Sequence, residues 1–183
     1  MTDQFKIKKK LYKYGHHFSS ESWANATIML DLSPNITSVE ESVTKQLRPI
    51  MIPRTKSRWQ TSSPETRFYD FKRMTLQLKV EGSISGSVTG TINGSSATFS
   101  ALDVKNILIA MMEAGGTLTS LKWRNEVFTR NASEVGSGEK RVDQNAFISD
   151  IRFVDKITEG SGNLMTQEVA YDFTMTIKIG EER

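Results

Sequence analysis

The stretch Gly82–Gly94, GSISGSVTGTING, has glycine at every fourth position and a branched apolar residue midway between glycines. In an extended chain the even positions share one face, which alternates glycine with isoleucine or valine. The odd positions form a strip of hydroxyl and amide side chains on the other face. Asn93-Gly94 is a preferred two-residue hairpin turn. Two interpretations stay open: a long strand that reaches past the body of the protein, or a mobile loop, since interior glycines weaken strands.

Segments on either side of this tract show the alternation of half-buried strands. Met74–Val80 alternates apolar and polar residues in the same phase as the tract, and Val169–Ile179 does so without interruption. Phe147–Ile157 keeps one phase with two polar breaks, and Leu118–Phe128 is a weaker candidate. We therefore expect at least four strands in the second half of the chain.

One helix is predicted over about residues 101–114. Ser100 and Asp103 match a capping box, apolar residues fill most of one side, and Gly115-Gly116 supplies the left-handed end. Strands, one helix and then more strands indicate an α+β protein. We expect a mostly antiparallel β-barrel or sandwich with this helix on its flank.

The first part of the chain differs from the second in its proline content and in its hydrophobic periodicity. Residues 1–67 contain all four prolines and little sustained periodicity, so we expect an extended N-terminal arm, followed by a β domain over residues 68–183. Within the arm, Ala24–Leu32 is a candidate strand and Ser38–Leu47 a candidate short helix. Residues 1–73 carry 13 Lys and Arg against 7 Asp and Glu, and the remainder carries 11 against 14. This asymmetry favours docking of the basic arm on an acidic surface of a neighbouring protein.

The sequence has few residues suited to catalysis. It has no cysteine, and its two histidines, His16 and His17, are adjacent, so that in an extended chain they point in opposite directions. Neither phosphate-loop pattern occurs, and no apolar run approaches the length of a membrane span. We expect a protein that is not an enzyme, has no cofactor or metal and has no membrane partner.

Two binding functions are alternatives. Lysines at positions 6, 8, 9, 10 and 13 are interleaved with aromatic residues, as in a nucleic-acid-binding β-barrel that uses a basic N-terminal arm. An edge strand protected by lysines has the same pattern, and we favour that interpretation. The three tryptophans, Trp23, Trp59 and Trp123, suggest a carbohydrate-binding module as a further alternative. They are scattered along the sequence, however, which favours positions in the core or in an interface.

The order of elements over about residues 70–180 resembles a known family. A strand ends in Gly82, the Gly/Ser/Thr tract follows, and a helix closes on Gly115-Gly116. A tryptophan-bearing strand over Leu121–Phe128 then precedes two long strands separated by a polar loop. This order resembles tail-tube, tube-initiator and baseplate-associated structural proteins of tailed phages, archaeal tailed viruses and contractile injection systems.

The resemblance implies a self-assembling structural subunit in the virion tail, made in the host cytoplasm. Its sheets would join edge to edge in a ring homo-oligomer, for which we expect a hexamer, and the ring would stack on adjacent tail tube, sheath or baseplate proteins. DNA would meet the ring only by passage through its lumen. We expect the interface to include the hydroxyl strip and four basic residues of the arm: Ser83, Ser85, Ser87, Thr89 and Thr91, together with Lys8, Lys10, Arg54 and Arg58.

Overall fold

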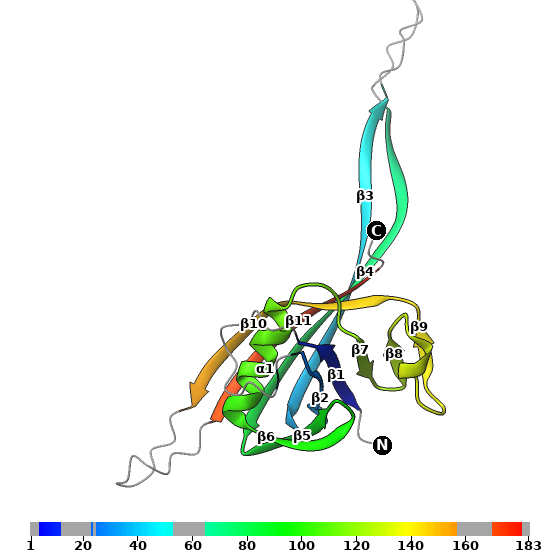
Figure 1. The fold of residues 1–183 in the computed structure, drawn as a ribbon. Helices are drawn as coiled ribbons and strands as arrows, with labels where there is room; N and C mark the ends of the chain where they lie inside the picture. The colour runs from blue at the N-terminus through cyan, green and yellow to red at the C-terminus, as the bar shows by residue number, and fades with distance from the viewer. Residues whose placement is uncertain (1–3, 12–22, 24, 53–64, 157–169, 181–183) are drawn as a thin grey trace, which may run out of the picture.

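The computed structural model describes residues 4–11, 23, 25–52, 65–156 and 170–180, which form two β-sheets and one α-helix (Figure 1). Sheet A has seven strands. In spatial order they are β6 (Ser95–Ser100), β5 (Ser87–Ile92), β2 (Thr27–Asp31), β1 (Phe5–Lys10), β7 (Ser120–Trp123), β8 (Glu126–Phe128) and β9 (Lys140–Val142). All neighbours in sheet A are antiparallel except β8 and β9, which are parallel.

Sheet B has four antiparallel strands. Their spatial order is β10 (Asn145–Lys156), β11 (Ala170–Gly180), β4 (Glu65–Ser85) and β3 (Ile36–Ile52). The prediction of a β-rich α+β fold with one helix is confirmed, and the two sheets do not close into a barrel.

The core lies between the sheets and under helix α1 (Ala101–Glu113). Sheet A contributes Ile7 and Ile28 and sheet B contributes Leu78, Met175 and Ile177, all with no exposed surface. The alternation predicted for the last strand is confirmed, because every second residue from Tyr171 to Ile179 is buried. Burial of these apolar side chains is the main favourable contribution to folding.

Helix α1 matches its prediction closely. Ser100 Oγ accepts a hydrogen bond from the Asp103 backbone N–H, and the Asp103 carboxylate accepts one from the Ser100 backbone N–H. At the other end, Lys9 of β1 donates from Nζ to the carbonyl oxygens of Gly115 and Gly116, at 2.5 and 3.0 Å. Burial lowers the pKa of Lys9, and its cation lies where the negative end of the helix dipole favours it.

The N-terminal segment differs from the expected arm. β1 lies in the interior of sheet A, with β2 on one side and β7 on the other, and its Phe5 and Ile7 are buried. β4 also runs without a break through the expected domain boundary at residue 67. The alternation in β1 covers only six residues, and lysines fill its polar positions, so the sequence resembles a charged edge strand although the strand is central.

The expected short helix at Ser38–Leu47 is wrong, because these residues belong to β3. Val39, Val43 and Leu47 are spaced by four, which suits a helix, but an even spacing also suits one face of a strand. The register between β3 and β4 shifts at two places, between Ile36 and Ser38 and between Lys45 and Leu47. A similar shift in β10, between Ile148 and Asp150, places Phe147 on the opposite face from Ile151 and Phe153, so the single phase expected for this strand is wrong.

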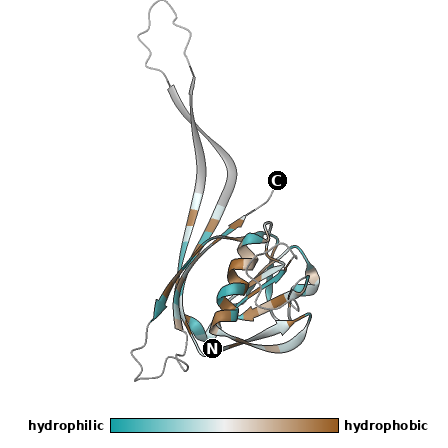
Figure 2. Ribbon diagram, turned by 60° about the vertical axis from the view of Figure 1, so that its left-hand side comes forward, coloured by the Kyte–Doolittle hydropathy of each residue, from teal (hydrophilic) through white to brown (hydrophobic). Residues whose placement is uncertain are grey.

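Strands β3 and β4 continue past the rest of sheet B as a two-stranded ribbon. In Figures 1 and 2 this ribbon extends away from both sheets and from α1. The pairing continues to Ile52 opposite Glu65. The ribbon is therefore an extension of sheet B that lies outside the core.

Candidate interaction surfaces

The Gly82–Gly94 tract connects the two sheets. Residues 82–85 complete β4 in sheet B, the chain turns at Gly86, and residues 87–92 form β5 in sheet A. Gly86 has φ +80°, a conformation that favours glycine. The tract is therefore strand on both sides of a corner, neither a single long strand nor a loop. The Asn93-Gly94 turn is confirmed, with φ of 50° and 88°.

The hydroxyl strip follows this corner. Ser83 and Ser85 lie on β4, while Ser87, Thr89 and Thr91 lie on β5. Strand β6 adds a second column, since Thr91, Thr89 and Ser87 pair in register with Ser96, Thr98 and Ser100. We call these six residues of β5 and β6 the hydroxyl face. It carries no charge, and all its members are exposed except Thr91, which is half-buried.

The three β6 hydroxyls were not among the predicted interface residues. The signal that locates them is the two-residue turn at Asn93-Gly94, which fixes the pairing of the flanking strands. Counting outward from this turn places Thr98 opposite Thr89.

The predicted basic residues are placed differently from one another. Lys8 forms an ion pair of 2.7 Å with Glu134 of the same chain, and Lys10 is exposed at the end of β1. Arg54 and Arg58 lie outside the described residues. The Lys8 cation is therefore used within its own subunit, while Lys8 and Lys10 share the polar side of β1.

The polar loop after β8 is held to sheet A by further charges. Glu134 of the loop pairs with Lys8 of β1, and Glu139 pairs with Lys122 of β7. Within the loop, Glu139 Oε2 accepts a hydrogen bond from the Gly136 backbone N–H at 2.6 Å. Burial raises the pKa of Glu139, but the hydrogen bonds from Lys122 and Gly136 outweigh it and leave the pKa below its ordinary value. This loop is ordered within one chain.

Sheet B has one face on the core and one polar face, which we call the open face. The register assigns basic and acidic residues to it in equal number: Lys79, Arg152, Lys156 and Lys178, with Glu40, Glu81, Asp150 and Asp172. Lys79 pairs with Glu81 and Lys156 with Asp172, each at 2.8 Å. Hydrogen bonds from these lysines lower the pKa values of Glu81 and Asp172. The charges of the open face therefore balance, and the same register adds the apolar side chains of Phe147 and Val154 to it.

The outermost strands of sheet B are β3 and β10. Both expose apolar side chains: Val43 of β3 is 56% exposed, and Val154 and Phe147 of β10 are 50% and 40% exposed. These residues make both edges partly apolar, although each edge also carries charges.

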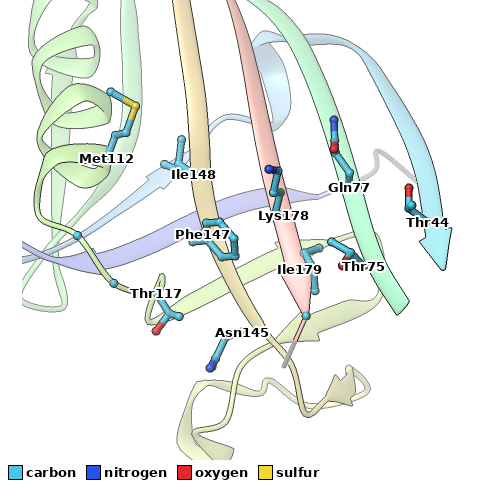
Figure 3. A pocket seen from close by; sticks show the side chains of 13 residues that line it. Thr44, Thr75, Gln77, Met112, Thr117, Asn145, Phe147, Ile148, Lys178 and Ile179 are labelled. Atoms are coloured by element: carbon cyan, nitrogen blue, oxygen red, sulfur yellow. The ribbon is translucent and has the colours of Figure 1, made fainter. Parts of the chain in front are cut away.

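A cavity of about 660 Å³ lies between the end of α1 and the part of sheet B from which the ribbon departs (Figure 3). Met112, Phe147 and Ile148 give it apolar walls, while Gln77 and Lys178, opposite each other in β4 and β11, are among its polar groups. Lys178 is the one titratable side chain among the described residues that line it.

Comparison with known proteins does not assign the chain to a family. No protein-family model matches it, and no curated protein sequence matches it. Among the described residues, no helix is long and apolar enough to span a membrane.

Proposed function

We propose that this protein is a non-enzymatic structural subunit of a phage-like tail, in the tube or in the region where tube and baseplate meet. Copies assemble into a ring through sheet B, and the ring stacks on neighbouring tail proteins. The observation that carries the proposal is a four-stranded sheet with a neutral, polar open face, two outer edges and a long ribbon that leaves the core.

The two edges support ring formation. If β10 of one copy lies beside β3 of the next, the β-ladder continues from subunit to subunit, and the outward backbone N–H and C=O groups of both edges gain partners. The open face then lines the ring. Its matched charges and its Ser and Thr side chains suit a water-filled lumen through which a polyanion passes without strong attachment.

The ribbon supports contact with a neighbour. A two-stranded ribbon is marginally stable by itself in water, because it has little surface to bury. The ribbon formed by β3 and β4 extends well beyond the rest of sheet B. Packing against another subunit would offset the cost of ordering it.

The ion pairs of β1 favour this role over nucleic-acid binding. Lys6 pairs with Asp31 at 2.9 Å and Lys8 with Glu134 at 2.7 Å, so both cations that share the polar side of β1 with Lys10 are neutralised within the chain. Burial raises the pKa of Asp31, but hydrogen bonds from Ser33 and Lys6 outweigh it and lower the pKa, which keeps this carboxylate ionised.

Electron microscopy and mass measurement of the purified protein test the proposal. We expect rings or short tubes, with a mass near six subunits for a single ring. A matched variant replaces residues 45–74 by Asn-Gly, which joins Thr44 to its register partner Thr75. This variant is expected to unfold cooperatively, as the wild-type protein does, but to lose stacking. A wild-type protein that remains monomeric at high concentration contradicts the proposal.

A further inference from the structure

The edge of sheet A at β6 differs from the other three sheet edges that the structure describes. β9 carries Lys140 and Arg141, and both outer strands of sheet B carry several charges and a register irregularity. These features restrict pairing to a partner strand whose charges and irregularities match them. β6 has the sequence SSATFS, without charge or proline, and pairs with β5 without a register shift. Its edge has none of these protections.

The backbone groups that β6 presents at this edge follow from the turn. In a hairpin with a two-residue turn, the flanking residues, here Ile92 and Ser95, exchange both hydrogen bonds, and the pattern then alternates. The N–H and C=O groups of Ser96, Thr98 and Ser100 therefore point away from β5. Ser100 N–H is used in the helix cap, where it donates to Asp103 at 3.1 Å. Ser96 and Thr98 are left to pair with a further strand.

We propose that β6 is a self-association edge at which β6 of a second copy adds in antiparallel orientation. If Ala97 lies opposite Ala97 of the second copy, Ser96 of each copy faces Thr98 of the other, and the four outward N–H groups find four carbonyl acceptors. The result is one continuous sheet of two copies of sheet A, related by a two-fold axis.

The side chains fit this register. On the outer side, Ser96 meets Thr98 of the second copy, which continues the hydroxyl pairs already present between β5 and β6. Cross-strand pairs of Thr and Ser stabilise sheets. On the inner side, the residue at the axis is Ala97, a side chain small enough for the close approach of a non-hydrogen-bonded pair. No like charges face each other in β6. The partner is therefore a second copy of this chain.

The inference is independent of the proposed ring, because it uses sheet A, while the ring uses sheet B. Four hydrogen bonds make a weak contact in dilute solution, so covalent trapping is the direct test. The chain has no cysteine. At the expected register the Cα atoms of Ala97 in the two copies lie about 4.5 Å apart, within the range that a disulfide spans.

The full chain carrying Ala97→Cys is expected to form a disulfide-linked dimer as the main product under mild oxidation. Thr89→Cys, on the exposed face of the interior strand β5, is the matched control and should remain largely monomeric when both proteins are oxidised in the same way and their masses are measured without reductant. A second pair measures association: Thr98→Lys should weaken self-association in sedimentation by about tenfold, because it places a charge at the edge. Thr89→Lys, its register partner, should leave association unchanged.

Failure of Ala97→Cys to cross-link above the level of Thr89→Cys would overturn the inference. So would self-association that Thr98→Lys leaves unchanged, since the contact would then lie elsewhere. Thr98 is exposed, so both lysine variants should unfold cooperatively with the melting temperature of the wild-type protein. This measurement separates loss of association from loss of fold.

Discussion

Gly90 shows why the tract alternates glycine with larger apolar residues. It lies on β5 opposite Leu30 of β2 and Ala97 of β6, on the side that faces the core. A Cβ atom at this position would overlap the carbonyl oxygen of Met29 and lie 2.9 Å from Cε2 of Phe99. The missing side chain thus allows β2 and the Phe99 ring to approach the backbone of β5.

We predict that Gly90→Ala destabilises the protein, although a helix or strand is usually more stable with alanine than with glycine at an interior position. The added methyl group must displace a backbone carbonyl and a buried ring, and overpacking of this kind costs about 1–3 kcal/mol. Urea unfolding monitored by tryptophan fluorescence measures the change. Thr89→Ala, one residue away and exposed, is the control and should change the free energy of unfolding by less than about 0.5 kcal/mol. Equal stabilities of the two variants would show that β5 shifts freely.

The loop between β8 and β10 illustrates how charges order a segment with little apolar content. It includes the short helix η3 (Ala132–Glu134) and β9, and it is attached to β1 and β7 by the Lys8–Glu134 and Lys122–Glu139 pairs. Because these pairs are partly buried, they are screened less than pairs fully exposed to solvent.

We predict that acid releases this loop before the core unfolds. The pKa of Glu139 is lower in the folded protein than in the unfolded chain. Its contribution to stability is therefore complete above about pH 4.3 and is lost as the pH falls through the lower folded value. Hydrogen exchange of residues 130–144, corrected for the intrinsic pH dependence, should show the loss.

Glu139→Gln should remove this pH dependence and increase exchange of the loop at neutral pH by about fivefold, equivalent to about 1 kcal/mol. Glu126→Gln is the matched control. Its partner Lys140 is 3.7 Å away and largely exposed, so the substitution should have little effect. Equal exchange in the two variants would mean that the loop is held by something other than Glu139.

Elements with a complete local pattern were predictable from the sequence. Helix α1 has both its cap and its glycine end, β11 alternates over eleven residues, and the Asn93-Gly94 turn has its preferred residues. β1 was harder to place, because it is only six residues long and its neighbouring strands, β2 and β7, are known only from the fold. The acidic partners of its lysines Lys6 and Lys8 are likewise known only from the fold. Of the candidate interface, the hydroxyl strip follows from alternation, while its corner at Gly86 and the charge pairing of Lys8 depend on tertiary structure.

The distribution of charge in the whole molecule separates the ribbon segment from the remainder. Residues 45–74 contain 8 Lys and Arg against 2 Asp and Glu, a net charge of +6, and the rest of the chain contains 16 against 19, a net charge of −3. A basic segment in an otherwise acidic chain favours contact between residues 45–74 of one copy and the remainder of another.

We predict that assembly weakens with salt. Raising NaCl from about 0.05 to about 0.5 M should reduce the association constant by about tenfold, since exposed charges are screened over shorter distances. Light scattering at fixed protein concentration measures this. Residual association of the variant without residues 45–74 should respond much less. Assembly that strengthens with salt would instead indicate an interface dominated by apolar contacts.

The central position of β1 has a consequence for biosynthesis. This strand is translated before the other strands of sheet A, but one of its two neighbours is β7, and the Lys8–Glu134 pair joins residues 126 positions apart. Contacts so distant along the chain slow folding, because a long loop must close before they form. The nascent polypeptide must therefore carry an incomplete sheet A until β7 has been translated, and during that interval its unpaired strand edges can pair with the wrong strand.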